Sequence, residues 1–180
     1  MKIKRDDAFF LFIDIQEKFI PHIHKSSELL KQISILIQGV ETLKIPYIVS
    51  EQNPDKLGQT ENSISRLMQQ YSPFHKMCFS CAENDSLLQK IKESGRNSII
   101  LCGIEAHICV LQTAMDLIDL GFKVYVLEDG VSSRTEFHKQ NGLNRIRQHS
   151  GIITNIESVL FELCGIAGTD EFRLVSKLIK

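Results

Sequence analysis

Short runs of apolar residues alternate along this chain with segments whose apolar positions have helical spacing. The runs are rich in Ile, Val and Phe and lie at 8–13, 46–50, 97–102, 123–127 and 151–154. The segments of helical period lie at 26–43, 85–94, 106–120 and 136–148. Such alternation predicts parallel strands joined by right-handed crossovers, with helices on both faces. We therefore expect an α/β fold, a three-layer α/β/α, Rossmann-like parallel sheet of about six strands.

The composition is that of an ordinary globular protein and narrows the classes of partner. The chain has 180 residues, of which 43% are hydrophobic and 24% are charged, so we expect a single domain over residues 1–180. Lys and Arg total 21 against 22 for Asp and Glu, which leaves no overall basic field to attract nucleic acid or an anionic membrane. We therefore expect a small-molecule substrate, with no nucleic-acid partner and no membrane partner.

The N-terminal segment and the cysteines predict a cytoplasmic location. Residues 1–7 carry several charges, and the apolar run 8–13 ends at Asp14, too short and too acidic at its end for a signal peptide or a membrane span. The chain has 5 cysteines, an odd number spread along its length, which favours reduced thiols over a disulfide framework. Of these, Cys102 and Cys164 lie in apolar surroundings, and we expect both to be inert core residues.

Two short patterns suggest a metal or redox centre, but neither has the partners that it needs. The pair Cys78-x-x-Cys81 lacks a second pair of zinc ligands, and a redox role would need the pair to open a helix. Chance placement near a strand end is the interpretation that we favour. The pair His22-x-His24 lacks a third ligand.

Polar side chains stand directly after the apolar runs, where open parallel sheets bind their ligands. Asp14 follows the first run, so its carboxylate is half desolvated and needs a cation, which Lys76 could supply. Cys109 lies near the start of the segment 106–120, where free N–H groups and the helix dipole lower the pKa of a thiol, as Lys76 also would. The other polar residues near strand ends are Gln16, Glu51, Gln52, His75, Glu105, Glu128 and Asp129. A base, a cation and a nucleophile can therefore meet at one edge of the sheet.

Each of these residues also has a purely structural interpretation. Asp14 alone could cap a strand end, and Lys76 alone could be a surface lysine. A cysteine on a helix of an α/β protein is usually buried in the core, which is the alternative for Cys109. The irregular segment 51–72 is long for a loop, and loops of that length usually serve binding.

Four motifs stand in order along the chain. They are Asp14-x-Gln16 after the first run, Lys76 followed by Phe79-Ser80, Gly103-Ile104 and Cys109-Val110 with Thr113-Ala114, and Gly121-Phe122-x-Val124-x-Val126 followed by Asp129-Gly130. Together they resemble the isochorismatase-like cysteine hydrolase superfamily, and the likeness runs from Ala8 to Leu160. The segment 103–113, the pair Glu51-Gln52 and the tail 161–180 are similar to the isochorismatase domain-containing proteins in particular.

The resemblance implies a catalytic triad of Asp14, Lys76 and Cys109. Asp14 would take the thiol proton, Lys76 would hold the carboxylate and the thiolate, and Cys109 would attack a carbonyl or imine carbon to form a covalent intermediate. The family also has a cis peptide before the nucleophile, here at Ile104-Glu105, with the N–H groups of Glu105 and Cys109 aimed at the developing oxyanion.

The resemblance also implies an oxyanion and substrate-binding set of Glu105, Ala106, Gln16 and Phe19. Phe19 would pack on a flat substrate, although a place in the core is nearly as good an interpretation for it. The neighbouring nicotinamidases bind a metal through an Asp-x-His pair after the second strand, where this chain has Glu51-Gln52-Asn53. We therefore expect no metal and no other cofactor.

The expected activity is that of a cysteine-nucleophile hydrolase of the amidase type, acting on a small amide-like (C–N) substrate. True isochorismatases use no cysteine nucleophile, so Cys109 argues against isochorismate as the substrate. Two alternatives stay open: a non-catalytic protein on the same fold, and a thiol-redox protein that uses Cys109. We also expect a homo-oligomer, a dimer or a tetramer, because family members commonly associate and the tail 172–179 is amphipathic. The alternative for the tail is packing on its own core.

Overall fold

A parallel sheet forms the centre of the computed structural model, which describes residues 2–180. Over these residues it has six strands, and every pair of neighbouring strands is parallel. The order across the sheet is β3-β2-β1-β4-β5-β6. The strands are β1 (Ala8–Ile13), β2 (Tyr47–Gln52), β3 (Phe74–Lys76), β4 (Ser98–Ile104), β5 (Lys123–Ser132) and β6 (Ile152–Thr154). The prediction of a Rossmann-like α/β sheet is confirmed.

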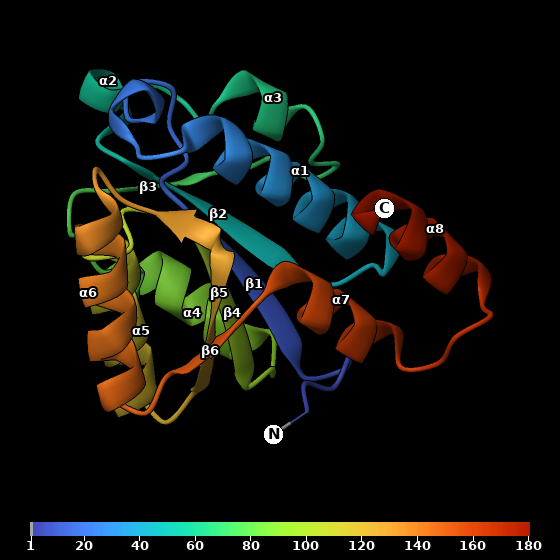
Figure 1. Cartoon of the computed structure of the whole chain (residues 1–180). Helices are drawn as coiled ribbons and strands as arrows, with labels where there is room; N and C mark the ends of the chain where they lie inside the picture. The colour runs from blue at the N-terminus through green and yellow to red at the C-terminus, as the bar shows by residue number, and fades with distance from the viewer. Residues whose placement is uncertain (1) are drawn as a thin grey trace.

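Helices cover both faces of the sheet (Figure 1). One face is covered by α1 (Ser26–Thr42), α7 (Ile156–Cys164) and α8 (Asp170–Ile179), and the other by α4 (Asp85–Glu93), α5 (Cys109–Asp119) and α6 (Glu136–Gln148). Several helices begin where a polar side chain accepts one of the first N–H groups, which is the usual way to satisfy a helix N-terminus. These capping residues are Asn84, Thr135, Asn155 and Thr169.

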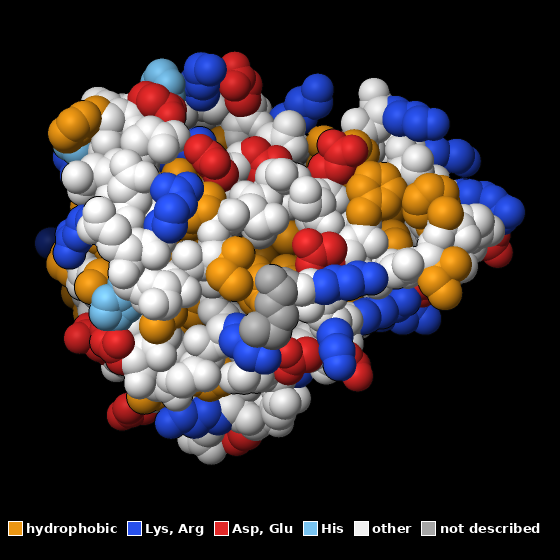
Figure 2. Space-filling model, turned by 60° about the horizontal axis from the view of Figure 1, so that its bottom comes forward, with side chains coloured by type: hydrophobic (Ala, Val, Ile, Leu, Met, Phe, Trp, Pro, Cys, Tyr) orange, Lys and Arg blue, Asp and Glu red, His pale blue; other side chains and the backbone are white. Residues whose placement is uncertain are grey.

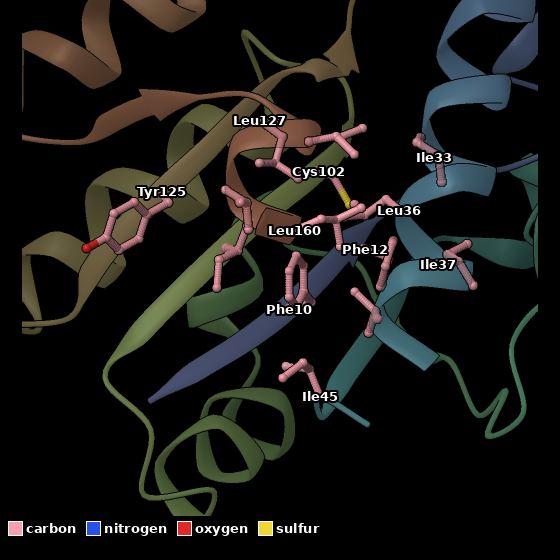
Figure 3. Close-up of a cluster of buried hydrophobic side chains, with 14 of the residues drawn as sticks. Phe10, Phe12, Ile33, Leu36, Ile37, Ile45, Cys102, Tyr125, Leu127 and Leu160 are labelled. Atoms are coloured by element: carbon pink, nitrogen blue, oxygen red, sulfur yellow. The ribbon is translucent and has the colours of Figure 1, made fainter. Parts of the chain in front are cut away.

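The two faces of β1 belong to two separate hydrophobic clusters, because side chains alternate along a strand. Phe10 and Phe12 face α1, where they lie among Ile33, Leu36 and Leu160 (Figure 3). Phe9, Leu11 and Ile13 belong to the other cluster, with residues of α4 and α5. Every residue of β1 is buried, as expected for the inner strand of a three-layer fold.

Three details of the fold differ from the prediction. β5 does not end at residue 127 but continues to Ser132, because the register against β4 jumps from Leu101 opposite Val126 to Gly103 opposite Val131. Glu128 and Asp129 therefore lie within β5 and not beyond its end. Asp129 instead accepts the N–H of Ile156 at 2.9 Å and so supports the start of α7.

The other two differences concern the segment 51–72 and Cys164. The irregular segment contains two short helices, α2 (Pro54–Leu57) and α3 (Asn62–Ser65). Cys164 is only partly buried, whereas Cys102 is fully buried as predicted. In the tail, α8 packs against α1 and α7 and buries Val175 completely. The chain itself therefore covers Val175, whereas Leu174 on the same helix stays exposed.

Figure 2 shows one face of the molecule, on which positive and negative side chains are mixed. Lys and Arg side chains are interspersed there with Asp and Glu side chains. This agrees with a formal net charge of −1 and leaves that face without a field of one sign.

Gly103 is a backbone position that we expect to tolerate no side chain. Its φ is +120°, and a Cβ at this residue would overlap the carbonyl oxygen of Ile13 on the neighbouring strand. Gly103→Ala should therefore lower the free energy of unfolding by about 3 kcal/mol or more, measured by urea denaturation. Gly95→Ala is the matched control: its φ is also positive at +67°, but nothing lies within 4 Å, so only about 1 kcal/mol should be lost. Equal losses in the two variants would contradict the prediction.

Candidate active site

The centre of the sheet is a topological switch point. From β1 the chain goes on to β2 on one side, and from β4 it goes on to β5 on the other side. Asp14 directly follows β1, and Cys109 opens the helix that follows β4. Because ligands of open α/β sheets bind at such a point, these two residues stand where a site is expected.

Asp14 is completely buried and both of its carboxylate oxygens are bound. Lys76 Nζ donates to Oδ2 at 2.7 Å, and Ser50 Oγ donates to Oδ1 at 2.7 Å. The backbone N–H of Asp14 bonds to the carbonyl oxygen of Ser50 at 3.1 Å. Asp14 also has φ +52°, a left-handed conformation that a non-glycine residue seldom adopts and that is common at functional sites.

Lys76 is the last residue of β3, and its ammonium group lies at the carboxyl ends of the strands. Besides Asp14, Nζ donates to Gln52 Oε1 at 2.8 Å and to the carbonyl oxygen of Phe79 at 3.0 Å. Burial is the largest influence and works to lower the pKa of Lys76, but the charge and the hydrogen bond of Asp14 oppose it, and the pKa is raised. The lysine therefore stays charged inside the protein.

Cys109 is the first residue of α5 and is 5% exposed. Burial is the main cause that raises its pKa well above the ordinary value, and the charge of Asp14 adds to the effect. Lys76 acts in the opposite direction but is outweighed. Lys76 thus lowers the pKa of Cys109 as expected, but the expected net lowering is wrong, because burial and the charge of Asp14 outweigh Lys76. At rest the site holds a neutral thiol beside a carboxylate.

Ser50, Gln52 and Cys81 belong to the same network, and sequence reasoning assigned no role there to Ser50 or Cys81. The Cys81 thiol is fully buried, donates to Ser50 Oγ at 3.5 Å, and has its pKa raised to about 12, chiefly by burial. Ser50 and Gln52 are two residues apart on β2, so they face the same side of the sheet. In the sequence, Ser50 stands two residues before Gln52, and this spacing was the signal that could have placed Ser50 in the site.

The turn between β4 and α5 contains two backbone N–H groups that are free to donate. Within residues 2–180, the N–H groups of Glu105 and Cys109 have no acceptor. The Ala106 N–H is bonded to the carbonyl oxygen of Ser132 at 2.8 Å, so it is not free to bind an oxyanion. The peptide bond between Ile104 and Glu105 is cis.

Gln16 and Phe19 lie close to Asp14 in the chain but contact the protein itself. The Gln16 amide is fully buried, donates to the carbonyl oxygens of Gln52 and Gly58, and accepts the N–H of Gln52 at 2.7 Å. Phe19 is partly buried against the cluster on the α1 face. Contact of either side chain with a substrate stays a prediction.

Glu51 holds the segment 51–72 in place. Its Oε1 accepts hydrogen bonds from Thr60 N at 2.7 Å, from Thr60 Oγ1 at 2.8 Å and from Tyr71 Oη at 2.6 Å. Glu51 and Gln52 are thus engaged by protein groups at the position where the nicotinamidases carry metal ligands. In the part of the chain from residue 2 to residue 180, no three His, Cys, Asp or Glu side chains gather as a metal site would need.

The chain folds as a three-layer α/β/α protein with polar side chains at its topological switch point, and comparison with known proteins identifies its family. A family model described as Isochorismatase domain matches residues 8–158. The chain therefore belongs to the isochorismatase family. It is 37% identical over 177 residues to the secreted isochorismatase effector Isc1 of Phytophthora sojae, covering 94% of this chain and 83% of the relative. It is 35% identical to isochorismatase domain-containing protein 2 of Xenopus laevis, covering 98% of this chain and 84% of that protein.

Solved structures agree with this assignment. The MAR1 ribonuclease of Caenorhabditis elegans superimposes with a TM-score of 0.93 at 33% identity, covering 99% of this chain and 92% of the other. The ycaC gene product of Escherichia coli, described as an octameric hydrolase of unknown specificity, gives a TM-score of 0.93 at 17% identity and covers 99% and 89% of the two chains. The latter likeness shows the fold alone.

Between residues 2 and 180, no helix is both long enough and apolar enough to cross a bilayer.

The buried ion pair leads to a prediction about stability. Lys76→Met would leave Asp14 buried without its cation, and the free energy of unfolding should fall by roughly 3–5 kcal/mol. Adding Asp14→Asn removes the uncompensated charge and should recover part of that loss, as a thermodynamic cycle of urea denaturation curves would measure. Lys92→Met, on the exposed side of α4, is the control and should change stability by less than about 0.5 kcal/mol. A double variant whose loss equals the sum of the single losses would show that the two groups do not interact.

Proposed function

We propose that this protein is a cysteine hydrolase of the amidase type, which cleaves a small amide-like (C–N) substrate through a covalent intermediate on Cys109. One observation carries the proposal: Asp14, bonded to Lys76 at 2.7 Å, directly follows β1, and Cys109 opens the helix after the neighbouring strand β4, so a carboxylate, a cation and a thiol stand at the switch point of the sheet. This is a base next to a nucleophile, with a cation that compensates the charge. Residues 1–180 act in this proposal as one hydrolase domain.

The first half of the reaction forms the covalent intermediate. Asp14 takes the proton of the Cys109 thiol as the sulfur attacks the substrate carbonyl carbon, and Lys76 stabilises the negative charge that moves onto sulfur. The carbonyl oxygen becomes an oxyanion, which the free N–H groups of Glu105 and Cys109 bind. When the oxyanion collapses, the C–N bond breaks and the nitrogen leaves with the proton that Asp14 had taken.

The second half releases the product. A water molecule gives a proton to Asp14 and attacks the thioester carbon, and the same N–H groups hold the second oxyanion. The C–S bond then breaks, and Asp14 returns the proton to the sulfur. The site is back in its resting state, a neutral thiol beside a carboxylate, and the acid product leaves.

The raised pKa of Cys109 supports this mechanism over the thiol-redox alternative. A redox-sensing cysteine is a thiolate at neutral pH and is accessible to oxidant. Cys109 has its pKa raised by burial and by Asp14, and it is 5% exposed. It therefore depends on a base that acts at the moment of attack. The intact set of Asp14, Lys76 and Cys109 weighs against the non-catalytic alternative. The proposed reaction needs no cofactor.

We also propose a cytoplasmic homo-oligomer, a dimer or a tetramer. All cysteines of the chain are free thiols, which fits a reducing compartment. Three large apolar side chains are exposed at the carboxyl edge of the sheet: Met77 (71%), Phe79 (52%) and Phe137 (75%). They flank the site, and a second copy could cover them. The octamer described for the E. coli relative supports such an assembly.

The hydrolase proposal predicts turnover that depends on one sulfur atom. A panel of small amides should contain substrates whose hydrolysis falls by at least about a thousandfold in Cys109→Ser. Intact mass measured under steady-state conditions should show an acyl adduct on the enzyme that carries no substitution. Cys164→Ser is the matched control and should keep full activity. A short single-stranded RNA joins the panel because the C. elegans relative is called a ribonuclease. RNA cleavage without any amide hydrolysis would overturn the amidase proposal.

The assembly proposal predicts a concentration-dependent mass. Light scattering at micromolar concentration should give a multiple of the 20.5 kDa chain mass. Phe79→Ser, which removes an apolar side chain from the proposed contact, should shift the protein toward monomer. Leu174→Ser is the control, because Leu174 is 52% exposed but lies on α8, away from the site. A monomer for the unmodified protein would refute the assembly and leave the triad untouched.

A further inference from the structure

Arg134 presents an unused guanidinium edge beside the candidate active site. It lies two residues after the end of β5, in the turn that leads to α6. Its Nε donates to Glu105 Oε1 at 3.1 Å. The Glu105 side chain is 7% exposed, whereas that of Arg134 is 58% exposed. Within residues 2–180, the two terminal nitrogens of Arg134 have no hydrogen-bond acceptor.

This arrangement resembles the way in which proteins prepare an arginine for a ligand. A guanidinium group is a rigid planar fork, and two of its N–H groups match the two oxygens of a carboxylate. Glu105 occupies Nε and fixes the plane of the group, so less conformational freedom is lost when a ligand binds. The side of the fork that faces solvent is left open.

Three contacts tie the Arg134 segment to the turn that carries the nucleophile. Besides the Arg134–Glu105 pair, the carbonyl oxygen of Ser132 accepts the Ala106 N–H at 2.8 Å, and Ser133 Oγ lies 3.0 Å from His107 Nδ1. The free N–H of Glu105 belongs to the same turn. Arg134 is therefore bonded to the side chain of Glu105, and the backbone N–H of Glu105 is one of the donors that the mechanism assigns to the oxyanion.

Arg134 keeps its positive charge at neutral pH, whereas the neighbouring His107 does not. His107 stacks on His138 with ring centroids 4.5 Å apart. Burial is the main cause that lowers the pKa of His107, with His138 and Arg134 adding to it and Glu105 opposing it, so His107 is neutral at pH 7. The charge of Arg134 is balanced on one edge by Glu105, which leaves its other edge for a second anion.

We propose that Arg134 binds a carboxylate of the substrate, so that the amides cleaved at Cys109 carry an anionic group close to the scissile bond. This inference rests on the proposed function of Cys109. It assigns to Arg134 a role in substrate selection and none in the chemical steps.

Two reagents of nearly equal size test the proposal without knowledge of the substrate. Iodoacetate and iodoacetamide both alkylate a thiol: a C–S bond forms, the C–I bond breaks, iodide leaves and the thiol proton is lost. Only iodoacetate carries a carboxylate. The rate of each reaction at Cys109 is measured by peptide mass mapping. Partly buried Cys164 in the same sample serves as the reference thiol for the intrinsic difference between the reagents.

The expected result is a change in the ratio of the two rates. In Arg134→Gln the iodoacetate rate at Cys109 should fall about tenfold, while the iodoacetamide rate stays within about twofold. Arg134→Lys keeps the charge without the fork and should lose an intermediate amount. The control is Arg147→Gln, on the exposed last turn of α6, and it should leave both rates unchanged. Circular dichroism confirms that each variant is folded.

Other outcomes overturn the inference in distinguishable ways. An unchanged ratio in Arg134→Gln, or an equal slowing of both reagents, would mean that Arg134 only supports the turn. If Arg134→Gln does not fold, the ratio in Arg134→Lys decides, and no change there rejects the proposal. If folded, unmodified protein reacts with neither reagent at Cys109, the proposed function itself fails and the inference falls with it.

Discussion

The buried ion pair between Asp14 and Lys76 is the interaction on which this part of the structure depends. Both side chains are completely removed from solvent, and charged groups survive there only when every partner is in place. The partners come from separate strands: Asp14 follows β1, Ser50 and Gln52 belong to β2, and Lys76 ends β3. The segment after β3 adds the carbonyl oxygen of Phe79. A single electrostatic requirement thus fixes how these strand ends sit relative to one another.

The same pair gives the neighbouring thiol its resting state. A carboxylate with a cation on one oxygen and a hydroxyl on the other is fully solvated by protein, and the Cys109 thiol beside it is held neutral by burial and by that negative charge. A neutral, buried thiol reacts slowly with oxidants in solution. The arrangement therefore favours a sulfur that reacts only when a substrate fills the space next to it.

Periodicity and strand ends were enough to predict the sheet, the helices on both faces and the places of Asp14 and Cys109. They failed where a contact joins residues far apart in the chain. β3 has three residues with one apolar side chain among them, too few for a periodic signal. The end of β5 was misplaced because its shifted register against β4 has no mark in the local sequence. The pKa of Cys109 was assigned the wrong direction because burial depends on the whole fold.

The bonds of Gln16 carry a consequence for how this family can diversify. Its amide contacts only main-chain atoms of Gln52 and Gly58, so it fixes the path of the segment after β2 without reading the side chains there. The exposed residues of α2, Asp55 and Lys56, are therefore open to replacement while the strand ends stay in register. Substitutions in this short surface segment can therefore change the substrate preference of such a scaffold, while the residues of the candidate active site stay the same.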